Sequence, residues 1–427
     1  MEQDLNKINK QVRLIYEEYK NDKEILKKFI SLLQTSIPVQ LKSLKNYNIQ
    51  NNNKIQQQKL DDDFVVDYMK KCYYYYCNRS EIFIHYNKKH FIQYSEDDIL
   101  HEILSTLSNK SFQMNKYKVN KLIIKKIKDL SPLSIQPENE TIYNVTQYFI
   151  SCWNNRKMIK YFLCMIGDCL LKKKTNQYIY IVPKGLKKII RLIDTEYYSN
   201  FGTSNILGNI KLKYYEHDYS LCRLIFLSYT GKEPMKESYK YFIDILNVSC
   251  YYSNKYGDTD NYLKEYNKDA ALNDHILYLT KRNENNIIDN FVETSLTICN
   301  DSVIHYKDML FIWKKYLEYE NIPNIMFNDT MLQKIKTKIE YSSENEYFKN
   351  VTSIYLPCIS GFTNFWEENL QESIDNSITI DELIVLFKDV KDIKIVINQD
   401  FIMDLISHYY PEVIIENYTI KYIKRVF

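Results

Sequence analysis

Residues 117–130 read YKVNKLIIKKIKDL, and their periodicity decides the fold class. The apolar side chains recur three or four residues apart and form one stripe: Val119, Ile123, Ile127 and Leu130. A neighbouring stripe is entirely basic: Lys118, Lys121, Lys125 and Lys128. This pattern is typical of a helix that packs one face inward and turns a charged face outward.

Residues 184–194, KGLKKIIRLID, repeat the same design. The chain of 427 residues holds only seven Gly and eight Pro, so few turns interrupt it. Long helices are therefore favoured over many short strands. We expect a mainly α protein with small β elements, an α+β chain of more than one domain.

The predicted order begins with a helix at residues 4–33, which should stop near Pro38. The Asn- and Gln-rich residues 46–60 favour a polar linker. Residues 82–86 and 90–94 alternate in polarity and predict a β-hairpin, followed by a helix capped by Ser95 and Asp98. The expected divisions are an N-terminal helical segment (1–45), the linker (46–60), a hairpin-plus-helix module (61–109), a basic module (110–230), a helical connector (231–300) and a C-terminal region (301–427).

The C-terminal region contains a possible weak repeat. Residues 308–314 resemble residues 381–388, and each run precedes a second helix (330–339, 399–409) and an extended apolar piece (351–356, 413–420). Two winged-helix-like units are one interpretation, and two unrelated helical hairpins are the other. Residues 305–341 are about neutral, and residues 378–427 carry a net charge of −2, so we do not expect this region to contact phosphates.

Positive charge is concentrated in one segment. Residues 110–191 hold 17 Lys and Arg against four acids, whereas the whole chain is only +3. We expect nucleic acid to bind there through Lys118, Lys121, Lys125, Lys128, Lys172, Lys173, Lys174, Lys184, Lys187, Lys188 and Arg191. The alternatives are a solvated lysine face, an anionic membrane surface and an acidic protein.

Catalytic and metal motifs find little support. Thr230-Gly231-Lys232 lacks the upstream Gly of a phosphate loop. Cys72, Cys77, His85 and His90 form a C-x4-C-x7-H-x4-H array, but its middle spacer is short for a zinc finger. We predict no metal, no cofactor and no catalytic residue. No apolar run reaches the length of a membrane span, the start lacks a signal peptide pattern, and nine irregular Cys suit a reducing compartment.

Three stretches carry a resemblance to an uncharacterised family of giant nucleocytoplasmic large DNA viruses: 118–132, 161–168 (YFLCMIGD) and 308–327. The layout is also similar to the poxvirus-type primase-helicase, in which a "YFL…GD" helix precedes an ATPase strand. Residues 178–182 would be that strand, but Pro183-Lys184-Gly185 replaces the phosphate loop.

The resemblance implies a viral derivative without ATPase activity, located in the virus factory of the host cytoplasm or in the virion interior. The expected role is non-enzymatic, in replication, transcription or genome packaging, with the acidic remainder of the chain on a viral protein partner. A virion scaffold that binds no nucleic acid and a cryptic or degenerate primase-helicase-like enzyme remain alternatives. DNA or RNA as the ligand stays open.

Overall fold

Helices dominate the computed structural model, which describes residues 2–108, 116–173, 177–202, 206–212, 218–232, 242–387 and 396–426. Over these residues the fold is mainly α with four small sheets of three strands each, as the sequence predicted. The chain divides into two units. Unit 1 comprises residues 1–77, 82–86 and 93–131, and unit 2 comprises residues 78–81, 87–92 and 132–427.

The N-terminal helices differ from the prediction. The expected helix at 4–33 is interrupted between α1 (Glu2–Tyr19) and α2 (Lys23–Ser31), where the Asp22 carboxylate caps α2 by accepting from the amides of Glu24 and Ile25. The chain then passes through one π-helical turn (Leu32–Ser36) into α3 (Ile37–Lys71). Pro38 lies in the first turn of α3, where no amide donor is needed, so it does not stop the helix.

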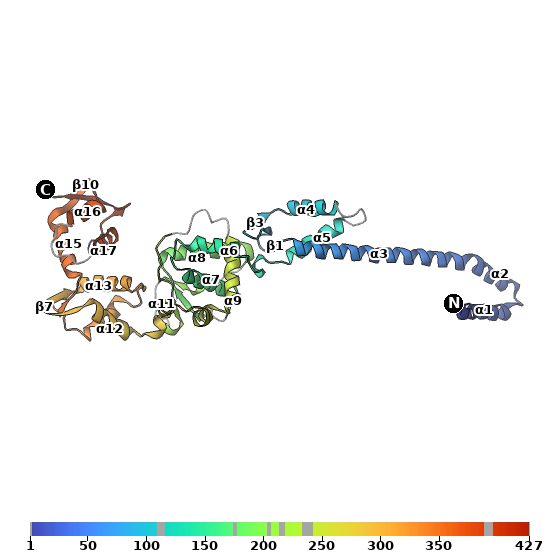
Figure 1. The fold of residues 1–427 in the computed structure, drawn as a ribbon, viewed down its shortest axis with the longest axis horizontal. Coiled ribbons are helices and arrows are strands. Elements are labelled where there is room, and N and C mark those ends of the chain that lie inside the picture. Colours follow the sequence, from blue (N-terminus) through green and yellow to red (C-terminus); the bar gives the residue numbers. More distant parts are fainter. Residues whose placement is uncertain are drawn as a thin grey trace. The chain divides into compact units, whose positions relative to one another are not determined.

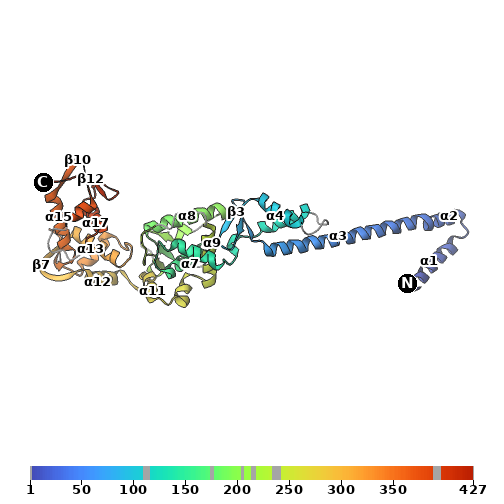
Figure 2. The same cartoon turned by 45° about the horizontal axis from the view of Figure 1, so that its top comes forward.

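The predicted linker at 46–60 is wrong, because these residues form the middle of α3. They contain no Gly or Pro, and Gln, Lys and Leu propagate a helix well. Every buried residue of α3 lies at its C-terminal end: Asp61, Phe64, Val65 and Tyr68. In unit 1, α5 (Lys116–Lys128) packs against that end and α4 (Glu96–Ser108) against α5. The preceding turns of α3 extend beyond α4 (Figure 2).

The body of unit 1 is built on a sheet of order β1-β2-β3: β1 (Tyr74–Cys77), β2 (Ile82–Tyr86) and β3 (Phe91–Tyr94). The predicted hairpin is confirmed, and the Asn87 side chain accepts from the amides of Lys89 and His90 in its turn. Ser95 caps α4 (Glu96–Ser108) as expected, since its hydroxyl accepts from the Asp98 amide. Side chains of α3, α4 and α5 (Lys116–Lys128) share one core.

The first part of unit 2 surrounds a parallel sheet of order β5-β4-β6. Its elements are α6 (Asn139–Phe149), α7 (Arg156–Leu170), β4 (Ile179–Ile181), α8 (Lys184–Phe201), β5 (Ile210–Lys211), β6 (Cys222–Leu224) and α9 (Phe242–Tyr256). Helix α7 packs closely on α9 (Figure 1). A Cβ at Gly167 would overlap the Ser249 carbonyl, so only glycine allows this approach.

Three 3₁₀ turns belong to this part: Pro132–Ser134 before α6, Ile206–Asn209 before β5 and Tyr219–Leu221 before β6. Four short helical segments follow α9 and lead to the C-terminal part of unit 2: α10 (Thr259–Asn261), a π turn (Tyr262–Tyr266), α11 (Ala270–Ile276) and a 3₁₀ turn (Leu279–Lys281).

The C-terminal residues form two modules with the same element order: helix, strand, helix, helix, strand, strand. The first module is α12 (Glu284–Ser295), β7 (Thr297–His305), α13 (Tyr306–Tyr319), α14 (Asn328–Lys336), β8 (Tyr341–Ser342) and β9 (Tyr347–Thr352). The second is α15 (Leu356–Asn369), β10 (Leu370–Thr379), α16 (Ile380–Phe387), α17 (Gln399–Tyr409), β11 (Ile415–Glu416) and β12 (Thr419–Arg425).

The sheets of both modules are antiparallel, and each places the last strand between the other two, in the orders β7-β9-β8 and β10-β12-β11. Each first strand also contains a register shift, between Ile298 and Val303 and between Glu372 and Ser377. The repeat therefore extends to sheet order and strand irregularity. It begins at α12, earlier than the expected boundary at 301.

Candidate nucleic-acid interface

The predicted basic module does not belong to one unit. The boundary between Ser131 and Pro132 separates the lysines of α5, in unit 1, from those of α7 and α8, in unit 2. Lys110 and Lys174 lie outside the described residues. The two basic helices are therefore two separate candidate surfaces.

Helix α5 presents its lysines as the sequence predicted, but both ends of the stripe are neutralised. Lys118 Nζ lies 3.9 Å from the buried Asp61 carboxylate, and Lys128 Nζ lies 3.4 Å from that of Glu96. Val119, Ile123 and Ile127 are fully buried on the inner face. Lys121 and Lys125 are exposed and have no ion pair among the described residues, so the available charge lies mid-helix.

An exposed aromatic ring adjoins this charge. Tyr117 is 78% exposed and lies one helical turn before Lys121, on the same face as the lysine stripe. We define Tyr117, Lys121 and Lys125 as the α5 face.

Helix α8 carries the stronger of the two surfaces. Lys184, Lys188 and Arg191 are exposed and Lys187 is half-buried, all on the side opposite the buried Leu186, Ile189, Ile190 and Ile193. None of the four cations has a carboxylate within ion-pair distance in the part of the chain that the structure describes. We call these four residues the α8 face.

Sequence reasoning missed Arg79, which extends the α8 face. Its guanidinium stacks on the ring of Tyr198 at 3.9 Å, and Tyr198 is seven residues, two helical turns, after Arg191. The loop is held in place because the Arg79 amide donates to the Asn200 carbonyl and the Ser80 hydroxyl to the Asn200 side chain, at 3.3 and 2.9 Å. Only the fold brings residue 79 to this helix.

Lys173, by contrast, does not point outward. Its ammonium donates to the carbonyls of Ser253 and Gly257, both at 2.7 Å, and lies 3.9 Å from Asp168 Oδ1. Its charge is therefore used inside unit 2, and its expected role at the surface is replaced by a structural one. Lys172 is exposed immediately after α7.

Asp168 explains why a cation is needed there. The carboxylate accepts from the Ser253 hydroxyl at 2.5 Å and from the Thr259 amide at 2.8 Å, and it is almost fully buried. Burial raises its pKa from 3.8 to about 6, while these two hydrogen bonds and Lys173 oppose the rise.

The connection from β4 to α8 leaves no room for a phosphate cradle. Only Val182 and Pro183 separate strand and helix, and Pro183 has no amide to donate. The Tyr229 hydroxyl lies 2.5 Å from the position a Cβ on Gly185 would take, so a side chain already fills the space at the helix start. A phosphate loop needs several backbone amides converging on one point.

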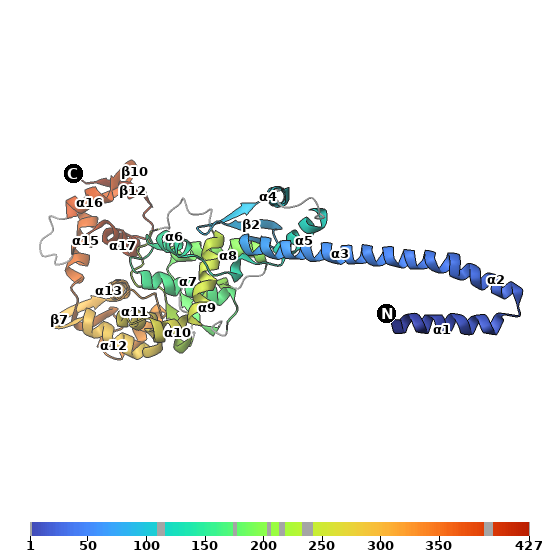
Figure 3. The ribbon, with the colours of Figure 1, turned by 45° about the vertical axis from the view of Figure 1, so that its right-hand side comes forward.

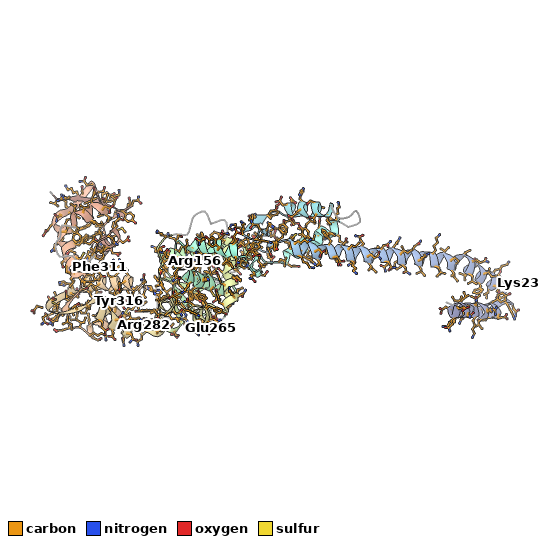
Figure 4. All side chains as sticks on the ribbon, viewed as in Figure 1. Lys23, Arg156, Glu265, Arg282, Phe311 and Tyr316 are labelled. Carbon is orange, nitrogen blue, oxygen red and sulfur yellow. The ribbon has the colours of Figure 1, made fainter. Side chains whose placement is uncertain are left out.

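The third helix of the second C-terminal module, α17, contacts α13 of the first module. Lys314 Nζ lies 2.6 Å from Asp404 of α17, Lys315 bonds to Asp404 and Glu318, and the Tyr409 hydroxyl donates to Asp308 at 2.7 Å. Figure 4 marks Phe311 and Tyr316 on the same helix, α13, and Phe311 packs edge-on against Phe401 of α17. The turn joining β8 and β9 carries Glu344 and Glu346.

The array of Cys72, Cys77, His85 and His90 has no metal-site geometry. Among the described residues, no group of three or more His, Cys, Asp or Glu could hold a metal ion. Burial raises the pKa of the Cys77 thiol to about 12, which disfavours the thiolate that zinc needs. His90 Nδ1 instead lies 2.7 Å from the buried Asp244 carboxylate, and the Phe91 amide donates to the same carboxylate. This pair anchors residues 90–91 on α9.

The chain has no match among family models, curated proteins or solved structures. Among the described residues, no helix is both long and apolar enough to cross a membrane.

Proposed function

We propose that this chain is a non-enzymatic nucleic-acid-binding protein that contacts phosphates through the α8 face and the α5 face. The observation that carries the proposal is the α8 face with Arg79, a set of cations that no carboxylate neutralises among the described residues. Phosphate affinity grows with the number of cations on one surface, because each contact releases counterions.

Aromatic rings favour single strands as the ligand. Tyr117 is exposed beside Lys121, and Tyr198 lies beside the α8 cations with Arg79 on its ring. Unpaired bases stack on such rings, whereas the bases of a duplex already stack on one another. An acidic protein would use the lysines but would not need the rings.

The C-terminal modules have the element order typical of winged helices, and we infer that they are winged-helix-like units that bind protein. Their third helix would be the reading helix in a nucleic-acid complex. In the second module that helix is α17, which is bonded to α13 of the first module. In the first module, the β8–β9 turn is acidic. Both features oppose phosphate contact and suit a protein partner. A role in viral replication, transcription or packaging is consistent with the proposal and rests on the resemblance described above.

The test compares pairs of substitutions that remove the same charge from unit 2. Lys188→Ala/Arg191→Ala removes half of the α8 face, and Lys264→Ala/Lys268→Ala removes two exposed lysines elsewhere. Binding of a generic single strand is measured against salt by fluorescence anisotropy. The α8 variant should lower the salt slope by about 1.4, since each phosphate contact on a single strand contributes about 0.7. The control should keep the slope of the unmodified chain.

If both double variants lowered the salt slope equally, net charge alone would explain the binding and the α8 face would not be a specific contact. No binding of single strand or duplex by the unmodified chain at low salt would favour the scaffold interpretation instead.

A further inference from the structure

One face of α13, in the first C-terminal module, is covered by a helix of the second module. Lys307 Nζ donates to the Tyr409 carbonyl at 3.1 Å, and the Asp308 carboxylate accepts from the Tyr409 hydroxyl at 2.7 Å. The ring of Phe311, about one turn later, packs edge-on against Phe401. Lys307, Asp308 and Phe311 therefore form a docking face on α13, and the amphipathic helix α17 lies against it (Figure 3).

The repeat of the two modules identifies the equivalent face on α16. Helices α13 and α16 each begin directly after the first strand of their module. Counted from the start of each helix, the positions of the α13 docking face correspond to Asp381, Glu382 and Val385 of α16. Val385 is 65% exposed, whereas its equivalent Phe311 is fully buried. The described chain therefore leaves open on α16 the face that a helix covers on α13.

The open face of α16 forms one side of a groove of about 630 Å³, and β10 and β12 form the other side. The groove is lined by four apolar side chains, two from the helix and two from the sheet: Val385, Leu386, Ile378 and Ile423. An apolar side chain of a partner would leave water on entering it, as Phe401 of α17 does against α13. We call this the α16 groove.

Charged groups around the α16 groove indicate what the partner carries. The carboxylates of Asp381 and Glu382 already accept hydrogen bonds within the module. Lys424 and Arg425 of β12 also line the groove, and they form no ion pair among the described residues. Carboxylates of a partner would pair with these two cations, as Asp404 of α17 pairs with two lysines of α13.

We propose that the α16 groove binds a helix of a partner protein that presents an apolar side chain and, about one turn away, a carboxylate. Helix α17 is an example of such a helix, since Phe401 and Asp404 are three residues apart. The inference rests on the protein-binding role proposed for the modules, and it names the site and the kind of partner.

The third helix of the first module does not have this chemistry. Counted from the start of each helix, α14 carries Thr330 and Gln333 at the positions of Phe401 and Asp404. It presents neither an apolar side chain nor a carboxylate there. The modules of a second copy would therefore not cover the α16 groove in the way that α17 covers α13, which favours a different protein as the partner.

The experiment uses the full chain and a synthetic helix as the probe. The probe is a fluorescent peptide of residues 398–410, held helical by a lactam bridge between positions 403 and 407. Ile402→Ala, Leu405→Ala and Ile406→Ala remove from the peptide the side chains that α17 buries in its own module. In the full chain, α17 is tethered beside α13 at a high effective concentration, so the peptide meets that face already occupied and the α16 groove open.

Peptide binding is measured by fluorescence anisotropy. Val385→Glu should raise the Kd of the peptide at least tenfold, because a carboxylate replaces the apolar contact. Val39→Glu is the matched control, since Val39 is 68% exposed on α3 and the change adds the same charge, and it should leave the Kd unchanged. Lys424→Ala/Arg425→Ala should also raise the Kd, and this difference should shrink at high salt.

Circular dichroism should show equal helix content in all variants. Val385→Glu should bind a nucleic-acid single strand as the unmodified chain does, so the groove and the nucleic-acid contacts are tested separately.

The proposal would be overturned if the unmodified chain showed no saturable binding of the peptide up to about 1 mM. Equal Kd values for Val385→Glu and Val39→Glu would also overturn it, because the peptide would then bind elsewhere. If the chain alone formed a dimer that Val385→Glu dissociates, the groove would bind a second copy and the proposed partner would be wrong.

Discussion

At the scale of the residue, Lys172 and Lys173 are adjacent and identical in chemistry but differ in what they contact. Lys173→Ala removes the donor from two carbonyls and the cation from Asp168. The free energy of unfolding should fall by about 2 kcal/mol, because the buried Asp168 loses its cation and the partly buried Ser253 carbonyl loses its donor. Lys172→Ala is the matched control and should leave stability nearly unchanged. Urea denaturation of both variants measures the difference.

Nucleic-acid binding by folded Lys173→Ala should keep the salt slope of the unmodified chain. If Lys173→Ala instead lowered the salt slope of nucleic-acid binding and left stability unchanged, Lys173 would be a phosphate contact and not a structural residue.

Asp168 should make stability depend on pH in a specific direction. Its pKa is raised to about 6 in the fold from 3.8, so the folded chain holds this proton more tightly than the unfolded chain. The contribution of this proton to stability is full below pH 3.8 and is lost as the pH rises through about 6. The unfolding free energy of the unmodified chain minus that of Asp168→Asn should be larger at pH 4.5 than at pH 7.5, by roughly 2 kcal/mol.

Asp269→Asn provides a control of opposite sign. The Leu272 amide and Lys157 lower the pKa of Asp269, so its stabilisation is present at neutral pH and is lost on acidification. The same sign in both variants would contradict the assignment.

At the scale of the element, α5 combines lysines with one exposed ring. Tyr117→Ala should weaken single-strand binding between about fivefold and a hundredfold, because one base loses its stacking surface. Duplex binding should change little. Tyr117→Phe keeps the ring and should bind normally, and Tyr143→Ala removes a 57% exposed tyrosine from α6 as a control. If Tyr117→Ala weakened binding of single strand and duplex equally, the role of Tyr117 would be to maintain the fold and not to stack on a base.

Elements with strong local signals were predictable from the sequence. The buried faces of α5 and α8, the β2–β3 hairpin and the Ser95 cap depend on residues within a turn or two of each other. Residues 46–60 have the polar composition of a linker, yet they are helical, because they contain no Gly or Pro to break a helix. A polar composition predicts that a segment is exposed, but it does not exclude a helix, because a segment without Gly or Pro can be helical while it buries no side chain.

The features that escaped prediction depend on distant contacts. Arg79 meets Tyr198 across more than a hundred residues, and Lys173 turns inward because α9 and its following turn present two carbonyls to it. The boundary at residue 131 also follows from how the chain packs, not from its local charge. One sequence can show which helices are basic, but not which lysines remain available.

Across the chain, the surroundings of the cations differ between regions. Among the described residues, Lys121 and Lys125 of α5 and the four cations of the α8 face form no ion pair, whereas Lys314, Lys315 and Lys338 of the C-terminal modules are paired with carboxylates. Several module lysines therefore join elements of the modules, whereas the α8 face and the middle of α5 carry outward charge. This division agrees with phosphate contacts on α5 and α8 and a protein-binding role for the modules.

The exposed part of α3 has a thermal consequence. Before Asp61 this helix buries nothing, so its hydrogen bonds are held by helix propagation alone and not by a core. Such a segment follows a helix–coil equilibrium, in which turns open one after another from the end farther from the anchor. Asn51, Asn52 and Asn53 propagate a helix poorly, so the turns on their N-terminal side should open at a lower temperature than the turns between them and Asp61. On warming, this part of α3 should lose ellipticity gradually, well below the sharp transition of the two packed bodies.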